Sequence, residues 1–567
     1  MLNQSKNFSL LSLCLVIGLF ASCKSTLKPL SSQVVQVTPQ PLELIGTKVP
    51  ATINATFPAQ WFNKKATLTV TPVLRYANGE AVGTPYSYQG EKVAGNGQTI
   101  PAKEGANVTL KSSFDYVSEM RNSQLFLTFD AKIGKKSIAL PDLEIGQGVL
   151  ATAALINPMS EQTAIAADGF QRVIKEAYDA NILFLIQQAE LRSTELKKGE
   201  VVDWKDIVAS AAATENQKVD IEISAYASPD GGYDLNEKLA GKRESVTKEY
   251  LSKELKKSKI QAPINARYTA QDWEGFKILV EKSNIQDKDL ILRVLSMYSD
   301  SEQREREIKN ISTVYSDLAE TILPQLRRSR LTANIEIIGK SDDEIVAAAQ
   351  SNPRSLSVEE LLYAATLAKT DAEKEALYKK VTEIFPNDAR GFNNLGAVQF
   401  AQGKITDAEK AFKQALKLSS NLPEANYNAG WVALTEGDTD TASQFFGKSA
   451  GVPQLNNAMA YLDVLKGNYT QAAKTFGQSA GNNAAVAQIL AKDYNAAQTA
   501  LDKITSPDAD TYYLKAIVAA RTNNLNSVVE NLKQSVALDA NKATQALSDT
   551  EFAKYAANAA FLKAVVK

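Results

Sequence analysis

The amino-acid sequence predicts a multidomain protein with an all-β sandwich near its amino end, an α+β domain in the middle and an all-α helical solenoid at its carboxyl end. Three observations support this order. Residues 35–153 alternate apolar and polar side chains between turn signals, residues 221–250 read as a strand, a glycine turn and a helix, and residues 352–567 repeat at a spacing of ~34 residues. The chain has 567 residues, enough for several domains of about 100–200 residues each.

The composition argues against several classes of function. The net charge is −1, so no overall positive field favours nucleic acid as a partner. Histidine, the most common general base and zinc ligand, is absent, and the two cysteines, Cys14 and Cys23, both lie near the amino end. We therefore expect no enzymatic activity, no metal and no cofactor. A hydrolase that uses carboxylates is the alternative.

The amino end is typical of a secretory signal. An apolar stretch from Phe8 to Ala21 is shorter than the ~20 residues of a membrane-spanning helix. We predict a signal peptide at residues 1–22 and a polar tether at residues 23–34. The run Phe20-Ala21-Ser22-Cys23 resembles a bacterial lipobox, with Phe in place of the usual Leu. This resemblance implies that Cys23 carries acyl chains such as palmitate. A plain secretory signal with an incidental cysteine is the alternative.

Residues 35–153 are predicted to form the β-sandwich. Apolar residues alternate with others across 66–76 and 125–133, as expected of half-buried strands. Turn signals recur at Asn78-Gly79 and Asn96-Gly97, which fits several short antiparallel strands. No cluster of acidic or aromatic residues stands out as a site, so we expect a spacer or a docking module.

Residues 169–341 are predicted to form the α+β domain, because strands and long helices alternate there. The predicted strands are 181–186, the stretch that begins at Ile221, 263–268 and 332–338. The predicted helices are 204–214, the segment after Asp234, and three segments at 272–282, 288–298 and 302–323. The helices are expected to pack against a single sheet.

The helix after Asp234 carries the run Asn236-x-x-Leu239-Ala240-x-x-Arg243, which places Asn236 and Arg243 on one helix face. This run after a strand and a turn resembles the OmpA-like family. The resemblance implies binding to the stem peptide of peptidoglycan, with Arg243 pairing with a carboxylate. The acidic residue expected eight positions before Asn236 is replaced by Ser228, so Asp230 is the candidate for pairing with the ammonium group. Asp230 as an ordinary turn residue is the alternative.

The carboxyl part, residues 352–567, repeats itself. Residues 389–422 align with the chain from 423 onward, so that glycine, alanine and phenylalanine recur at matching positions. This spacing and these residue types are the signature of tetratricopeptide (TPR) repeats, which present a concave face to peptides or proteins. The candidate residues of that groove are Asn394, Tyr427, Asn428 and Trp431. Packing between hairpins is the alternative for Tyr427 and Trp431.

Together these features predict a non-enzymatic lipoprotein of the outer membrane that links components of the cell envelope. A sandwich before such a domain is similar to the arrangement in envelope lipoproteins of the Bacteroidota. The expected partners are the membrane through the lipid anchor, peptidoglycan through the α+β domain and other envelope proteins through the repeats. The alternative is an assembly or adhesion factor for surface structures that does not bind peptidoglycan. Whether the protein faces the periplasm or the cell surface stays open.

Overall fold

The computed structural model describes residues 27–310 and 312–566, and the side chains of residues 312–314 are not described. The predicted signal peptide at residues 1–22 and the predicted lipidation site at Cys23 lie outside the described residues. The chain forms two compact units, one made of Met1–Ala167 and Phe385–Lys567, the other of Asp168–Ile384. The solenoid predicted at 352–567 is thus divided between them, and each unit is described by itself below.

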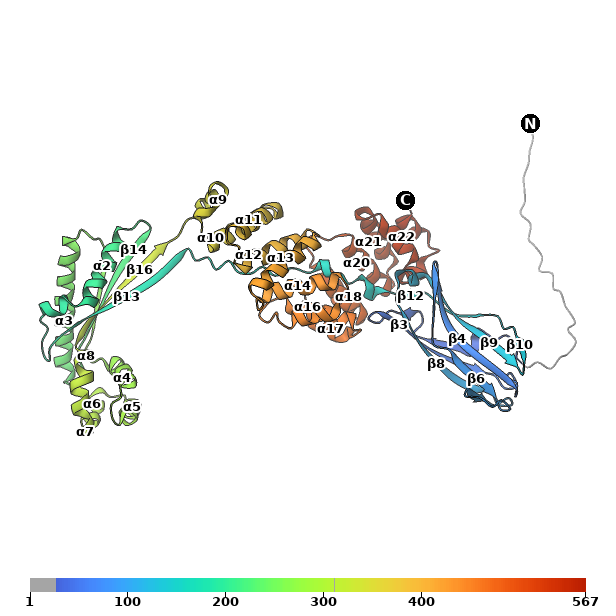
Figure 1. Ribbon diagram of the computed structural model, residues 1–567, viewed down its shortest axis with the longest axis horizontal. Helices are drawn as coiled ribbons and strands as arrows, with labels where there is room; N and C mark the ends of the chain where they lie inside the picture. Colours follow the sequence, from blue (N-terminus) through green and yellow to red (C-terminus); the bar gives the residue numbers. More distant parts are fainter. Residues whose placement is uncertain (1–26, 311, 567) are drawn as a thin grey trace, which may run out of the picture. The chain divides into compact units, whose positions relative to one another are not determined.

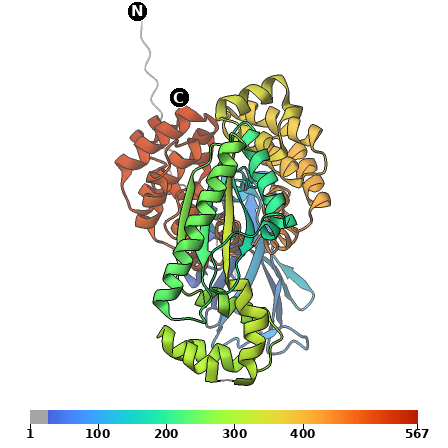
Figure 2. The ribbon, with the colours of Figure 1, turned by 90° about the vertical axis from the view of Figure 1, so that its left-hand side faces the viewer.

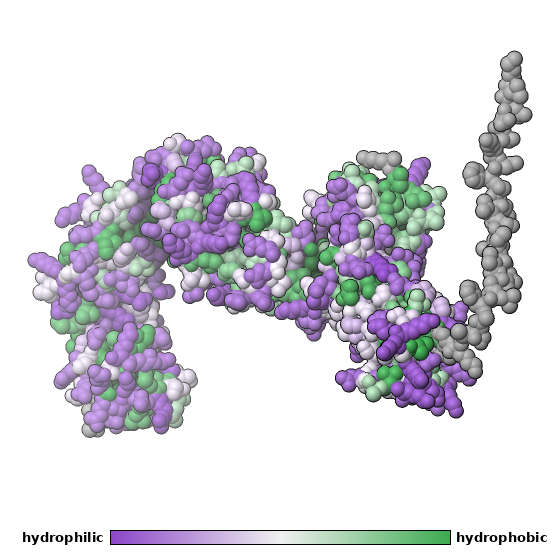
Figure 3. All heavy atoms as spheres, turned by 45° about the vertical axis from the view of Figure 1, so that its right-hand side comes forward, coloured by the Kyte–Doolittle hydropathy of each residue, from purple (hydrophilic) through white to green (hydrophobic). Residues whose placement is uncertain are grey.

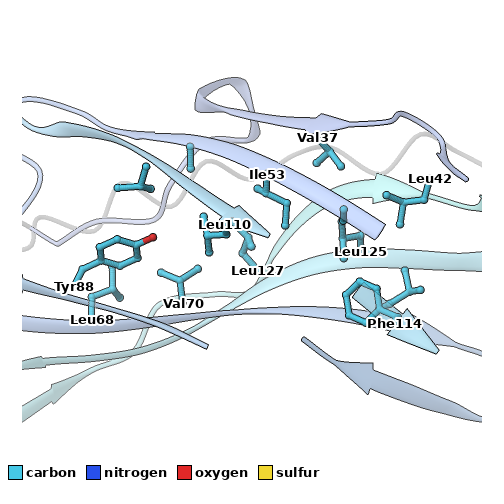
Figure 4. Packing of buried hydrophobic residues seen from close by; sticks show 14 of the residues in the cluster. Val37, Leu42, Ile53, Leu68, Val70, Tyr88, Leu110, Phe114, Leu125 and Leu127 are labelled. Atoms are coloured by element: carbon cyan, nitrogen blue, oxygen red, sulfur yellow. The ribbon is translucent and has the colours of Figure 1, made fainter. Parts of the chain in front are cut away.

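A β-sandwich opens the first unit, and its core lies between two sheets. One sheet has the strand order β1-β3-β8, and the other has β10-β9-β4-β6-β7 with β5 on β4 and β11 on β9. Ile53 and Leu110 of the first sheet and Val70, Leu125 and Leu127 of the second belong to one buried cluster, as the close-up in Figure 4 shows. The predicted β-rich amino-terminal region is confirmed.

The strands of this sandwich follow the alternation in the sequence. Along β3 the side chains from Val49 to Phe57 alternate between buried and more exposed positions. A short parallel pair, β2 with β12, joins the start of the sandwich to its end. The strands are β1 (Val35–Thr38), β2 (Leu42–Glu43), β3 (Lys48–Phe57), β4 (Ala66–Tyr76), β5 (Gly79–Val82), β6 (Tyr86–Gly90), β7 (Gln98–Ile100), β8 (Ala106–Asp115), β9 (Ser123–Ile133), β10 (Lys136–Ile138), β11 (Leu143–Gln147) and β12 (Val149–Leu150).

The rest of the first unit is an array of helical hairpins (Figure 1). The paired helices are α12 (Ala389–Ala401) and α13 (Ile405–Leu418), α14 (Pro423–Thr435) and α15 (Thr439–Phe446), α16 (Leu455–Leu465) and α17 (Tyr469–Phe476), α18 (Asn482–Leu490) and α19 (Tyr494–Asp502), and α20 (Ala509–Arg521) and α21 (Leu525–Leu538). Helices α22 (Asn541–Ser548) and α23 (Ala559–Val565) follow. The predicted all-α repeat region is confirmed.

Small residues let the two helices of a hairpin approach closely. A Cβ atom added to Gly396 would lie 2.7 Å from the ring of Phe412, and one added to Gly430 would lie 2.4 Å from the ring of Phe446. These are the glycine and phenylalanine positions that recur in the sequence. The recurring glycine therefore has a packing reason: next to the phenylalanine ring there is room only for a residue without a Cβ atom.

Polar contacts join the sandwich to the array within the first unit. The Tyr469 hydroxyl donates to the carbonyl of Leu44 at 2.8 Å. Arg521 donates two hydrogen bonds to the Glu551 carboxylate, at 2.7 and 2.8 Å, and Thr152 of the sandwich end donates to the same carboxylate. Because Glu551 and Thr152 are buried, these bonds hold the two parts of the unit together in a water-poor contact.

The second unit contains a four-stranded sheet in the order β13-β16-β14-β15, where only β14 and β15 are parallel. Helices α2 (Gly199–Ala213) and α3 (Tyr233–Lys257) cover one face, because their apolar residues share a buried cluster with β13, β14 and β16. Figure 2 shows α3, in green, lying along this sheet. The strands are β13 (Val173–Leu183), β14 (Gln217–Tyr226), β15 (Ile264–Thr269) and β16 (Arg328–Ile338), and the short α1 (Ser193–Leu196) precedes α2.

Three predicted strands of this unit have different limits in the structure. The strand predicted at 181–186 runs instead from Val173 to Leu183, the strand predicted from Ile221 begins at Gln217, and the last strand starts at Arg328 rather than Thr332. The prediction followed a continuous apolar run, but β13 is a sheet edge whose first half is exposed and mixes apolar with charged residues. It pairs with β16 along its full length, so the backbone ladder sets its limits.

Helices fill the remainder of the second unit. Between β15 and β16 lie α4 (Trp273–Lys282), α5 (Lys288–Met297), α6 (Ser301–Asn310), α7 (Ser312–Asp317), a π-helical turn (Leu318–Ile322) and α8 (Leu323–Leu326), with their own buried cluster. After β16 come α9 (Asp342–Ser351), α10 (Val358–Thr366) and α11 (Asp371–Ile384). Helices α10 and α11 lie within residues 352–567, the region for which repeats are predicted.

None of the helices in the described ranges combines the length and the apolar character that crossing a bilayer requires. The visible surface is mainly polar, with hydrophobic residues in scattered patches (Figure 3).

Candidate functional site: a strap bound by the helical array

Residues 156–167 of the first unit, here called the strap, connect the end of the sandwich to the start of the second unit. The strap has a short 3₁₀ turn at Pro158–Ser160 and no regular secondary structure from residue 162 onward, and burial alternates at residues 164–166 as in an extended chain. Buried asparagines on the first helices of three hairpins bind it: Asn394 on α12, Asn428 on α14 and Asn483 on α18. We call these three asparagines the asparagine ladder.

Each ladder residue binds both the N–H and the C=O of one strap residue. Asn428 accepts from the Ala164 N–H at 2.8 Å and donates to the Ala164 carbonyl at 2.7 Å. Asn394 does the same for Ala166, at 2.8 and 3.0 Å. A neighbour, Asn393, donates a further bond to the Ala164 carbonyl at 3.1 Å. A carboxamide has a donor and an acceptor side by side, which makes this two-point contact with a peptide unit possible.

The third contact extends this arrangement toward the sandwich. Asn483 accepts from the Asn157 N–H and donates to the Asn157 carbonyl, both at 2.8 Å. It also donates to the Glu161 carboxylate at 2.9 Å, and Asn457 donates to the other oxygen of that carboxylate at 3.4 Å. Burial raises the pKa of Glu161, and the two amide bonds only partly offset that effect.

The strap also buries small side chains. Ala164 and Ala166 are each 3% exposed, whereas Ile165 between them is 45% exposed. Alternate residues of an extended chain point to opposite sides, so the two alanines face the helices and the isoleucine faces away. Ala164 shares a buried cluster with Ala397 and Trp431 of the array. The contact therefore combines main-chain hydrogen bonds with tight packing of methyl groups.

The four predicted groove residues have different roles. Asn394 and Asn428 do bind an extended peptide segment, but that segment belongs to the same chain. Tyr427 and Trp431 are fully buried and pack against Phe446, and Trp431 also contacts Tyr461 edge-on with ring centroids 5.1 Å apart. Their rings fill the space between hairpins, which is the packing role that the sequence offered for Tyr427 and Trp431 beside a role in the groove. Burial holds the pKa of Tyr427 far above its usual value.

In the second unit, the predicted pair on α3 supports the preceding loops. Asn236 donates to the carbonyls of Ser228 at 3.0 Å and Gly231 at 2.8 Å. Arg243 is fully buried and lies over the ring of Phe184. Its guanidinium donates to three backbone carbonyls, those of Tyr226 at 2.8 Å, Gln188 at 3.0 Å and Leu185 at 3.2 Å.

Arg243 is thus placed as an internal brace rather than as an exposed ligand for a carboxylate. Burial lowers its pKa to about 10, so it remains charged at neutral pH, and the carbonyl dipoles balance its charge. The three backbone carbonyls carry no net negative charge, but they accept hydrogen bonds from the guanidinium N–H groups that would otherwise bind a ligand carboxylate.

Asp230 is also engaged within the protein. It forms an ion pair with Arg327 at 3.1 Å, accepts a short hydrogen bond from Ser228 and lies beside a cavity of about 10 Å³ that Trp273 and Tyr315 help to line. This volume is at the lower limit for one water molecule.

The described part of the chain holds no group of three or more acidic, cysteine or histidine side chains placed to bind a metal ion. The buried Asn393 and Asn483 were not among the predicted residues. Their signal is the recurrence of asparagine on the first helices of hairpins, which the shorter unit around Asn483 obscures.

Comparison with known proteins supports the repeats. The model of the tetratricopeptide repeat family matches residues 389–422. A TPR protein from Parabacteroides merdae is similar at 15% identity, over 37% of this chain and 90% of that one, with a TM-score of 0.28. The pilF protein of Pseudomonas aeruginosa is similar at 14% identity over 35% and 95% (TM-score 0.27), and yeast Tom70 at 13% over 50% and 67% (TM-score 0.25). No curated protein matches the sequence. The helices α12 and α13 thus carry a tetratricopeptide repeat.

Proposed function

We propose that this protein is a non-enzymatic scaffold that assembles other proteins in the cell envelope. The observation that carries the proposal is the asparagine ladder, which already holds an extended polypeptide segment by its backbone. Repeat arrays of this kind offer long surfaces for protein partners rather than reaction chemistry. The match of the repeat family to residues 389–422 supports the same reading.

The proposal includes a lipid anchor on Cys23 in the outer membrane. Its support is the lipobox-like run that ends in Cys23 after a short apolar stretch. A cysteine-to-serine variant, Cys23→Ser, tests this part in cells fed a clickable palmitate analogue. We expect label and membrane association in the wild type and neither in the variant. Equal labelling of both would show that Cys23 carries no lipid.

We further infer that the α+β domain is a divergent OmpA-like domain that has an architectural role. The spacing of Asn236 and Arg243 and the sheet order β13-β16-β14-β15 support the family resemblance. The contacts of Arg243 and Asp230 favour a role without peptidoglycan, because both side chains are engaged internally. Of the two functions that the sequence suggested, we therefore favour assembly of envelope or surface structures.

The scaffold function is tested in the producing cells. Full-length protein is crosslinked in intact cells through its surface lysines, purified under denaturing conditions and analysed by mass spectrometry. We expect crosslinks to at least one other envelope protein, found again in an independent crosslinking chemistry. If every crosslink joins two sites of this chain, the scaffold function is wrong.

A further inference from the structure

The ladder binds the strap mainly through the strap's backbone, and over the part of the chain that the structure describes Glu161 is the one strap side chain to which a ladder residue is shown to bond. At Asn157, Ala164 and Ala166 the bonded atoms of the strap are the main-chain N–H and C=O. Every residue except proline offers this pair of groups. Other extended segments can therefore satisfy the same asparagines.

The side chains of the strap add one requirement, which is size. Ala164 and Ala166 are buried against the array, while Ile165 faces outward. In a core with little free volume, a larger side chain at either alanine position would overlap its neighbours. A ligand of this surface thus needs small residues two positions apart, and the residue between them is free to vary.

The strap is an imperfect occupant of this surface. The Glu161 carboxylate is bonded by Asn483 and Asn457 and lies near Tyr427 and Tyr461, without a cationic partner in the described residues. Placing a carboxylate among amides and aromatic rings costs free energy when it is charged. A segment with a neutral residue at this position would avoid that cost.

We propose that the strap is an internal occupant of a peptide-binding surface, and that an extended segment of a partner with small residues two positions apart replaces it on Asn394 and Asn428. This inference rests on the proposed scaffold function and names the chemistry of its partner. Release of the strap would free the surface, so partner binding and loosening of the strap are coupled.

The test uses a fluorescent peptide with the sequence of residues 155–168 and the full-length protein. In one variant, Ala164→Arg and Ala166→Arg together remove the strap from its site without changing the ladder. The strap occupies the wild-type site most of the time. The apparent affinity of the peptide for the wild type therefore falls in proportion to the fraction of molecules whose site is free. We expect the peptide to bind the variant at least tenfold more tightly than the wild type.

Two controls make the result specific. A peptide with both alanines replaced by arginine is expected not to bind. Adding Asn394→Ala and Asn428→Ala to the strap variant is expected to abolish binding of the original peptide. Equal affinity of the original peptide for wild type and strap variant, or binding that survives loss of both asparagines, would overturn the proposal.

A second measurement covers the case in which the arginine variant does not fold. Amide exchange of Ala164 and Ala166 is followed in the wild type with and without millimolar peptide, a concentration similar to that of a tethered segment. We expect faster exchange at both amides when peptide is present. Unchanged exchange would refute displacement, whereas crosslinks to other proteins in cells would still support the scaffold function.

Discussion

Replacing Asn428 with alanine tests the ladder most directly. Its side chain makes hydrogen bonds to the Ala164 N–H, the Ala164 carbonyl and the Asn393 side-chain oxygen, at 2.8, 2.7 and 2.9 Å. A buried hydrogen bond contributes ~1 kcal/mol net, and a buried donor left without a partner costs ~1–3 kcal/mol. The carbonyl keeps its bond from Asn393, but the Ala164 N–H loses its partner.

We therefore expect Asn428→Ala to weaken docking of the strap by about 3 kcal/mol. This corresponds to an increase on the order of 100-fold in the exchange rate of the Ala164 amide, since ~1.4 kcal/mol is a factor of ten. Native-state hydrogen exchange, read at single-residue resolution, measures this rate. Overall unfolding is measured in parallel by chemical denaturation.

A matched control lies on the same helix. Asn426 is equally buried and donates to the carbonyls of Ser420 and Leu422, but it does not bind the strap. We expect Asn426→Ala to lower the free energy of unfolding while the Ala164 amide stays protected up to global unfolding. If both variants accelerate Ala164 exchange equally, the ladder does not hold the strap and the reasoning fails.

Three further predictions concern the charge of Glu161, the packing of a hairpin and binding to peptidoglycan. Burial raises the pKa of Glu161 in the folded state above 4.5. Glu161 therefore stabilises the docked strap below pH 4.5, and this contribution is lost as the pH rises through the raised pKa. Protection of the strap amides from hydrogen exchange should decline over that pH range, and Glu161→Gln should remove the decline. Gly430→Ala places a Cβ 2.4 Å from the ring of Phe446 and should lower the free energy of unfolding by about 1–3 kcal/mol in denaturant titrations, whereas Gly199→Ala, whose Cβ meets no atom within 4 Å, should not. Arg243→Ala should lower the melting temperature without changing retention on isolated peptidoglycan; reduced retention at an unchanged melting temperature would make it a wall ligand.

The repeats were predictable because they record a local rule of packing. Gly396 and Phe412 meet within one hairpin, and the next hairpin repeats the pair with Gly430 and Phe446. Contacts of this kind join residues close in sequence, so spacing alone reveals them. The limits of β13 were missed for the opposite reason, since its ladder with β16 joins residues far apart in the chain.

The α+β site shows a different limit of sequence reasoning. Asn236 and Arg243 do share one face of α3, as their spacing indicates, and both bond to loop carbonyls. A polar residue on a buried helix face can serve a ligand or the carbonyls of a nearby loop, and spacing does not distinguish these. The partner of Asp230 is Arg327, which lies 97 positions away, so only the folded chain decides that Asp230 is neutralised internally.

The role of the strap could not be predicted from its own residues, because the ladder bonds mainly to main-chain groups that almost every residue has. Two of its contacts, Asn394 with Ala166 and Asn428 with Ala164, join positions 228 and 264 apart in the chain. The ladder does determine the direction and the register of the segment that it binds. Asn394 and Asn428 are one repeat apart, and they bind strap residues two positions apart in the opposite order, so the strap runs against the order of the hairpins. Any partner segment that replaces the strap by the same bonds must run in that direction, with its two small residues in that register.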